Sequence, residues 1–248
     1  MPLFFVSPEN IDEKKKIVTI SGSEAKHITK SLRHKEKDEI MITDGIKNRY
    51  LVKIENIEKE DICCKIIHTF NHLSKPLPIK ISLAQALLKK NKMDFVIQKA
   101  TELGIHDIIP FTSSRTIPLV GKKSAEKKQE RWQKIALEAS KQSERMHVPE
   151  VQPIISFKEL LKKTSNYDWS MIFWEEENIH NIKELLQKRL KPSNMIYFIG
   201  PEGGFSEKEM QLARKANVFP VSLGEYVVRS ETAAIFAMSV FNYYYYIE

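Results

Sequence analysis

The stretch NMIYFIGPEGGFSEKE, residues 194–209, decides the fold. Its first six residues are almost uninterruptedly apolar, as is typical of a buried strand in a parallel sheet. A glycine-rich loop follows at residues 200–204, and Ser206 with Glu209 forms a Ser-x-x-Glu capping box that predicts the start of a helix. A strand, a glycine loop and a helix in this order indicate a ligand site at the carboxyl edge of an α/β sheet.

The composition of this loop narrows its ligand. Neither GxxxxGK[ST] nor GxGxxG is present, and the loop carries Glu202 but no lysine. A carboxylate repels phosphate groups, so the loop favours a nucleoside or a cation-bearing cofactor held by backbone hydrogen bonds. A tight turn with no ligand fits the same pattern equally well.

A second segment, SLGEYVVRSETAA at residues 222–234, repeats the arrangement of strand end, loop and helix. Arg229, Ser230 and Glu231 stand at its junction. An arginine there can anchor a phosphate or a substrate oxygen, and a surface ion pair between Arg229 and Glu231 is the alternative.

Around these loops, residues 79–248 alternate strands with longer helices, which predicts a parallel α/β sheet. The polar cluster that ends the long helix, Gln142, Ser143, Arg145 and His147, suits a site as readily as a solvated helix end. The final helix is apolar nearly all round, so Tyr243 to Tyr246 lie either at a subunit interface or against the chain's own sheet. The expected strands cover 79–87, 106–111, 167–177, 194–200 and 219–224, and the expected helices cover 90–104, the region of Trp132 to Ala139, and 231–248.

The first seventy residues predict a small β-barrel. One helix is expected at 21–33, a hairpin at 39–44 and 49–57, and a further strand at 62–70. The polar stretch 71–78 closes this module, so the chain of 248 residues is expected to form two domains.

Composition sets further bounds. The formal net charge of +7 favours a polyanionic partner, although scattered surface lysines give the same value. Cys63 and Cys64 are adjacent in a strand, which sends them to opposite faces and argues against a disulfide. No secretory or membrane-spanning pattern is present, so a cytoplasmic protein without membrane attachment is expected. His68 and His72 do not share a helix, and no metal site is expected.

The two loop motifs, IGPEGGFSEKE and LGEYVVRSETAA, resemble the paired carboxyl-terminal motifs of the ribosomal RNA small subunit methyltransferase E family, N3-methyluridine enzymes of the SPOUT class. HITKSLRHKEKD, KMDFVIQKATELGIHDIIPFTSSR and WQKIALEASKQSERMHVPEV resemble its upstream segments. The resemblance therefore covers nearly the whole chain in the right order.

This resemblance implies the fold, the cofactor and the partners. It implies a PUA-like β-barrel that binds RNA at residues 1–72 and a SPOUT-type α/β domain with a trefoil knot at residues 73–248. The implied reaction is transfer of a methyl group from S-adenosylmethionine to N3 of a uridine in 16S ribosomal RNA. The partners implied are that RNA or the assembled small ribosomal subunit, and a second copy of the chain joined through the knotted domain.

Site residues carry over by motif. Arg229 is the expected substrate contact or charge stabiliser, with Glu231 beside it as a second catalytic residue. Tyr226 and Ser230 depart from the family's usual pattern. The expected cofactor-binding residues are Gly200, Pro201, Glu202, Gly203, Gly204, Leu223, Gly224, Val228 and Thr232, and the expected RNA-binding residues are Lys30, Arg33, Arg115 and Arg145.

Two other functions fit the same sequence. The substrate could be transfer RNA, since the barrel does not name its RNA, or the chain could be a non-catalytic RNA-binding assembly factor that keeps a cofactor pocket. No His or Asp stands at a motif position that makes it an evident general base.

Overall fold

The computed structural model describes residues 3–45, 48–58, 61–70, 79–116, 121–188 and 191–246. It divides into two compact units. The first comprises Met1–Pro76 with Ser140–Val148, and the second comprises Leu77–Ala139 with Pro149–Glu248. The expected boundary between residues 72 and 73 lies in 71–78, outside the described residues, and stays a prediction.

The first unit is built on a sheet with the strand order β1-β4-β5-β6-β3-β2. The strands pair antiparallel except for β1, which is parallel to β4. The predicted hairpin and third strand are confirmed, and the predicted helix begins as α1 (Gly22–Lys26) and continues as a π-helical turn over His27–Ser31. Its strands are β1 (Leu3–Phe5), β2 (Ile11–Asp12), β3 (Ile17–Ser21), β4 (Glu39–Thr43), β5 (Arg49–Glu58) and β6 (Asp61–Phe70).

Alternation along β6 separates the two cysteines as the sequence predicts. Cys64 is fully buried in the core of the unit, whereas Cys63 is partly exposed, and both thiols are free. Burial of Cys64 raises the pKa of its thiol to about 12, so the thiol stays protonated and unreactive near neutral pH.

A short segment from the middle of the chain completes the first unit. Arg49 on β5 forms an ion pair of 3.3 Å with Glu144, and its Nε atom donates to the sulfur of Met146 at 3.3 Å. The Thr43 hydroxyl donates to the same sulfur at 3.5 Å. Glu144 and Met146, which lie among the polar residues at the end of the long helix, therefore pack on the strands of this unit. The choice between a site and a solvated helix end for the polar cluster itself stays a prediction.

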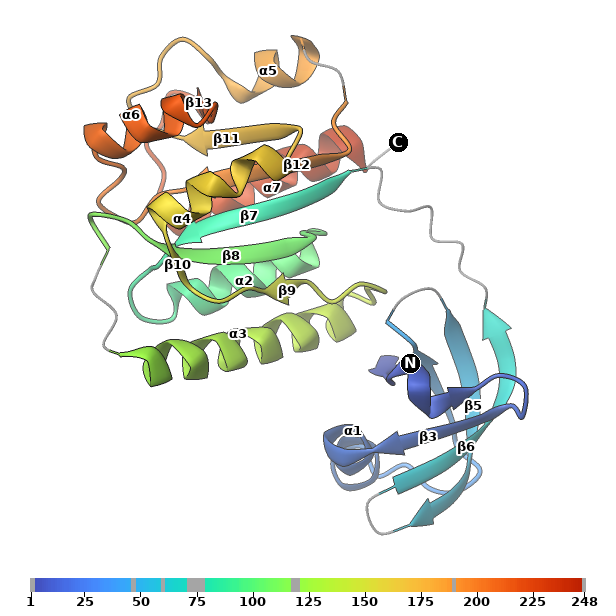
Figure 1. Ribbon diagram of the computed structural model, residues 1–248. Helices are drawn as coiled ribbons and strands as arrows, with labels where there is room; N and C mark the ends of the chain where they lie inside the picture. The colour runs from blue at the N-terminus through green and yellow to red at the C-terminus, as the bar shows by residue number, and fades with distance from the viewer. Residues whose placement is uncertain are drawn as a thin grey trace. The chain divides into compact units, whose positions relative to one another are not determined.

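The second unit is an α/β sheet with the strand order β10-β8-β7-β12-β11-β13, and β9 pairs with β8 (Figure 1). All described pairings in it are parallel, which confirms the predicted fold class. The strands are β7 (Lys80–Ala86), β8 (Asp107–Thr112), β9 (Glu150–Val151), β10 (Ile155–Ser156), β11 (Trp169–Phe173), β12 (Asn194–Ile199) and β13 (Phe219–Val221).

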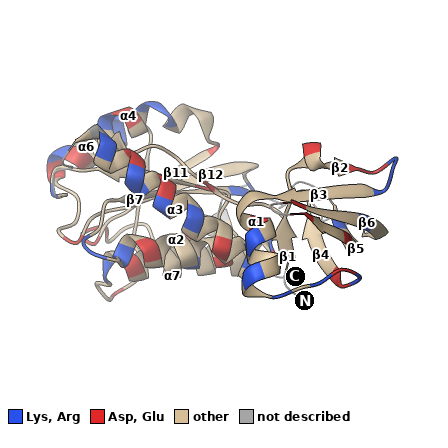
Figure 2. Ribbon diagram, turned by 90° about the horizontal axis from the view of Figure 1, so that it is seen from below, with Lys and Arg blue, Asp and Glu red and all other residues tan. Residues whose placement is uncertain are grey.

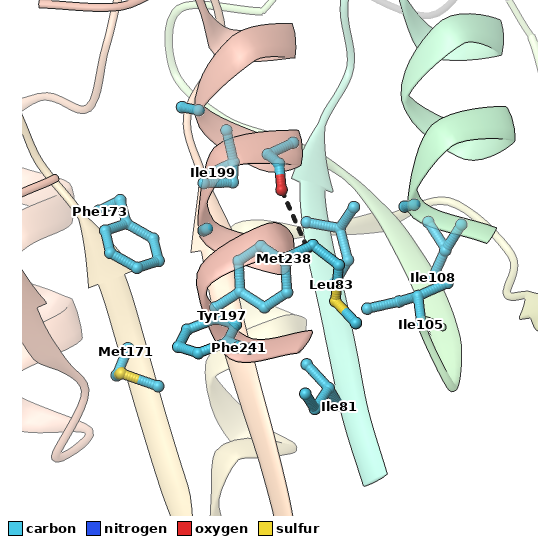
Figure 3. Close-up of a cluster of buried hydrophobic side chains, with 14 of the residues drawn as sticks. Ile81, Leu83, Ile105, Ile108, Met171, Phe173, Tyr197, Ile199, Met238 and Phe241 are labelled. Atoms are coloured by element: carbon cyan, nitrogen blue, oxygen red, sulfur yellow. Dashed lines mark hydrogen bonds between the residues drawn. The ribbon is translucent and has the colours of Figure 1, made fainter. Parts of the chain in front are cut away.

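Helices cover both faces of this sheet, and alternate residues of each strand feed two separate cores. Ile81 and Leu83 of β7 join the core beneath α2, α3, α5 and α7, whereas Ala84 and Ala86 join the core beneath α4 and α6. Figure 3 shows the first core, in which Tyr197 lies among apolar side chains from the strands and α7. The helices are α2 (Lys92–Glu102), α3 (Lys122–Gln142), α4 (Phe157–Lys162), α5 (Ile182–Lys188), α6 (Glu207–Lys215) and α7 (Ser230–Tyr245).

The last helix, α7, packs on the sheet but leaves several large side chains outside. Phe241 is fully buried and Tyr245 nearly so, whereas Phe236, Tyr243 and Tyr244 are exposed. Packing against the chain's own sheet is therefore confirmed for Tyr245, whereas the subunit interface stays a prediction. None of the described helices combines the length and the apolar character that crossing a membrane requires. The trefoil knot stays a prediction.

Candidate functional site

A cavity of about 380 Å³ lies at the carboxyl edge of the parallel sheet. The ends of β11, β12 and β13 and the loops after them form most of its wall, and α2 adds one side chain. This is the edge at which open α/β sheets bind ligands. The lining residues are Lys92, Phe173, Trp174, Glu175, Asn178, Ile199, Gly200, Pro201, Glu202, Gly204, Phe205, Ser222 to Ser230, and Ala233.

The glycine-rich loop owes its shape to the residues after it and opposite it. The predicted capping box is present, since the Ser206 hydroxyl accepts from the Glu209 N–H and the Glu209 carboxylate accepts from the Ser206 N–H. Gly204 has φ +68°, and a Cβ atom there would collide with the carboxylate of Glu175. Only glycine fits this position without strain, because other residues rarely adopt positive φ.

Glu209 also joins α6 to the loop that follows β8. Its carboxylate accepts hydrogen bonds from the Ser114 N–H and hydroxyl, each at 2.8 Å. Burial alone would raise the pKa of Glu209, but the hydrogen bonds from Ser206 and Ser114 more than offset burial and lower the pKa below its ordinary 4.5. The folded protein thus holds this carboxylate ionised.

This arrangement predicts acid sensitivity. A carboxylate with a lowered folded-state pKa stabilises the fold above pH 4.5, and that stability is lost as the pH falls through the lowered value. At pH 7, Glu209→Gln should lower the free energy of unfolding by about 1.5 to 3 kcal/mol, the range for hydrogen bonds to charged groups. Urea unfolding from pH 3 to pH 7 measures this difference, which should shrink toward pH 3.

The control is Glu159→Gln, which alters the capping box of α4 at an exposed position. It should cost much less at neutral pH because solvent replaces the lost hydrogen bonds. An equal loss in both variants would contradict the role given to the buried Ser114 contacts.

Ser230, the departure noted in the second motif, lies at the centre of a buried hydrogen-bond chain. The Gln85 side-chain amide on β7 donates to the Ser230 hydroxyl at 3.1 Å, and that hydroxyl donates to the Gly200 carbonyl. Gln85 is fully buried. Ser230 therefore ties the first residue of α7 to the end of β12, so the two loop motifs are joined directly.

The charged residues of the second motif do not pair with each other. Glu231 forms an ion pair of 3.2 Å with Lys92, which also lies 3.4 Å from Glu202. Within the described part of the chain, the Arg229 guanidinium has neither an ion-pair nor a hydrogen-bond partner, although it lines the cavity. The surface ion pair between Arg229 and Glu231 considered from the sequence is therefore absent.

The structure gathers most of the expected cofactor residues. Gly200, Pro201, Glu202 and Gly204 line the cavity, as do Leu223, Gly224 and Val228, whereas Gly203, Thr232 and Glu231 are not among its lining residues. The Gly203 carbonyl accepts a hydrogen bond of 2.6 Å from Arg115, in the loop after β8. Of the expected RNA-binding residues, Arg115 belongs to the second unit, and Lys30, Arg33 and Arg145 belong to the first.

Several residues around the cavity are not among those predicted from the sequence. Lys92 and Gln85 approach it from the β7 side, and the rule that carboxyl ends of parallel strands share an edge was the one signal that could have found them. Trp174 lines the cavity directly after β11, with the Arg214 guanidinium carbon 5.3 Å from the centre of its ring. No group of three or more His, Cys, Asp or Glu suited to a metal ion occurs in the described ranges.

Comparisons with known proteins cover both units. Residues 75–242 match the model of an RNA methyltransferase domain, and residues 20–67 match that of an RNA methyltransferase PUA domain. The chain is 34% identical over 231 residues to the ribosomal RNA small subunit methyltransferase E of Bacillus subtilis, covering 91% of this chain and 89% of that protein. The protein of that name from Rickettsia conorii is 31% identical, with 92% and 89% covered.

The chain is also similar to a solved structure of a protein of the same name. The crystal structure of a ribosomal RNA small subunit methyltransferase E from Neisseria gonorrhoeae, bound to S-adenosyl methionine, superposes with a TM-score of 0.82. The two chains are 31% identical, and the match covers 97% of this chain and 96% of that one. The likeness thus extends through both units and includes the cavity-forming segments.

Proposed function

The chain belongs to the ribosomal RNA small subunit methyltransferase E family, and from this premise we propose that it methylates N3 of one uridine in 16S ribosomal RNA. It is an S-adenosylmethionine-dependent ribosomal RNA methyltransferase. The observation that supports the finer assignment is the unpaired Arg229 in the wall of the cavity.

The cavity fits the cofactor by size and charge. Small-molecule sites typically measure about 300 to 1,000 Å³, and this one lies in that range. Leu223, Val228 and Ile199 offer apolar walls, and Gly224, at φ +128°, leaves open space where a Cβ atom would stand. Glu175, Glu202 and Glu225 provide negative charge suited to a sulfonium ion. When bound, S-adenosylmethionine supplies an activated methyl group on positively charged sulfur.

Methylation of uridine at N3 requires the nitrogen to lose its proton, which places negative charge on the uracil ring and its oxygens. A guanidinium without a protein partner is free to form paired hydrogen bonds with such oxygens. Arg229 is the cation that the cavity offers for this task. Much of the rate gain is expected from holding the nucleotide and cofactor in line, since a base inside a duplex is out of reach.

We assign RNA binding to cations of both units, and Figure 2 shows Lys and Arg on α1 and the turn that follows it in the first unit. The affinity for small-subunit RNA should fall steeply as salt rises, because each neutralised phosphate releases counterions. Replacing Lys30 or Arg33 by Gln should reduce the slope of log affinity against log salt by roughly 0.7 to 0.9. Filter binding at several salt concentrations measures this slope.

A matched control for charge is Lys99→Gln, because Lys99 is already paired with Glu102 at 2.9 Å on α2. Its slope should equal that of the unmodified protein. Affinity independent of salt would contradict an RNA substrate.

Two further assignments complete the proposal. Large apolar side chains are exposed on α7 and in the loop before it, with Tyr226 86% and Val227 82% exposed. Large apolar side chains that are exposed to this extent are typical of protein interfaces, which supports a homodimer formed through the second unit. Light scattering should then give twice the mass of one chain. A ribosomal RNA substrate supports a cytoplasmic location.

Mapping of methylated uridines by mass spectrometry tests the proposed reaction. Small-subunit RNA from cells lacking the gene should miss a single N3-methyluridine, and the unmodified gene should restore it. The gene encoding Arg229→Ala should fail to restore it. An unchanged map would overturn the uridine assignment and direct the search to transfer RNA.

A further inference from the structure

Lys92 stands where three distant segments of the chain meet. It is the first residue of α2 and lines the cavity. Its ammonium nitrogen lies 3.4 Å from an oxygen of Glu202 in the glycine-rich loop and 3.2 Å from an oxygen of Glu231 in α7. Lys92 therefore bridges the glycine-rich loop and the segment that carries Arg229.

The segment that precedes α2 holds Glu202 at a second point. The N–H of Lys89 donates to the same Glu202 oxygen at 3.3 Å. Burial acts to raise the pKa of Glu202, but its hydrogen bonds, including those from Lys89 and Lys92, lower it overall. The carboxylate is thus held ionised against α2, and the glycine-rich loop is held with it.

Glu231 depends on Lys92 for a partner more strongly than Glu202 does. Its side chain is only 15% exposed, and one of its two oxygens is buried without a hydrogen-bond partner among the described residues. Lys92 is the cation that offsets this charge. Without Lys92, Glu231 must reorient, because a largely buried carboxylate without a partner is costly. Such a change would move the first turn of α7, next to Arg229.

We propose that Lys92 is a positioning residue that couples cofactor binding at the glycine-rich loop to RNA binding at Arg229. This coupling rests on the proposed function. A cofactor that fixes the position of Glu202 also fixes Lys92 and, through Lys92, Glu231. The cofactor and the RNA therefore each bind to a segment that the other has already ordered. Because coupling free energy is reciprocal, RNA raises the affinity for cofactor by the same factor as cofactor raises the affinity for RNA.

The test measures binding of S-adenosylhomocysteine by calorimetry, with and without saturating small ribosomal subunits from cells that lack the gene. In the unmodified protein the subunits should tighten binding at least about fivefold, the lower end of typical allosteric coupling. In Lys92→Met the cofactor product should bind about tenfold more weakly, as expected for loss of one charged contact, and the effect of the subunits should fall below twofold.

Three variants separate positioning from general loss of structure. Lys92→Arg keeps a cation that can reach both carboxylates and should recover most of the coupling. Lys99→Met removes an ion pair of similar exposure from the same helix but away from the cavity, so coupling should remain. If Lys92 acts through Glu231, the double variant Lys92→Met with Glu231→Gln should show the coupling of Lys92→Met alone.

The outcomes distinguish the two proposals. Coupling that persists in Lys92→Met, or that disappears equally in Lys99→Met, overturns the role of Lys92 while methylation by the unmodified protein still stands. Methylation without any coupling in the unmodified protein also overturns it. Absence of both methylation and subunit binding overturns the proposed function itself. In that case the affinity of Lys92→Met for S-adenosylhomocysteine alone still tests the contact of Lys92 with the glycine-rich loop.

Discussion

Arg229→Ala is expected to lower the rate of methyl transfer by at least about 100- to 1,000-fold, the usual effect of removing a group that stabilises developing charge. Arg229 lines the cavity and its guanidinium has no partner in the described structure, so no paired group there takes over its positive charge. The substitution should leave the fold intact, because Arg229 caps α7 without a side-chain hydrogen bond. Single-turnover transfer of a labelled methyl group measures the rate.

Cofactor binding separates this role from a general defect. The affinity for S-adenosylhomocysteine should change less than about threefold, since the charge is needed when the uracil ionises rather than when the cofactor binds. Arg229→Lys should retain part of the rate because it keeps the charge but loses the planar fork. Turnover near that of the unmodified protein in Arg229→Ala would refute the assignment.

Ser230→Ala should be the most damaging substitution of a neutral side chain in the site. It removes a hydroxyl that accepts from the buried Gln85 amide and donates to the Gly200 carbonyl. Leaving a buried polar group without its partner costs about 1 to 3 kcal/mol, so the free energy of unfolding in urea should fall by that amount. Cofactor affinity should fall as well, because Gly200 begins the glycine-rich loop that is proposed to bind the cofactor.

Ser239→Ala provides the comparison on the same helix. Among the residues that the structure describes, the Ser239 hydroxyl bonds only to the Ile235 carbonyl one turn earlier, at 2.9 Å, so its loss breaks no link between described segments. Stability and cofactor affinity should both stay close to those of the unmodified protein. Equal effects of the two substitutions would show that the Ser230 bridge contributes nothing beyond its helix.

The sequence predicts those parts of the fold whose signals lie within a few neighbouring residues. The capping box of α6 needs only Ser206 and Glu209, three residues apart, and the sequence alone predicts it. The short helices α4 and α5 went unpredicted because six and seven residues show too little of the helical period. The contact of Glu144 with Arg49 joins residues 95 apart, and no pattern along the chain marks such a pair.

The same limit holds at the site. Sequence singled out both loop motifs because each strand end, loop and helix start is contiguous. An ion pair between Glu231 and its near neighbour Arg229 was one of two alternatives from the sequence, and the folded chain brings Lys92 to Glu231 instead. Ser230 stood out as a departure from the family pattern, but its role depends on Gln85, 145 residues earlier. Contacts between residues on distant strands can be identified only when the order of the strands in the sheet is known.

The segment Ser140–Val148 has a consequence for how this protein can be divided. Because it belongs to the first unit while the residues on either side of it belong to the second, that unit is a discontinuous module. A fragment beginning at residue 77 would carry Glu144 and Met146 without the Arg49 and Thr43 that contact them. Exchange of the first unit between relatives therefore has to transfer both pieces of sequence together.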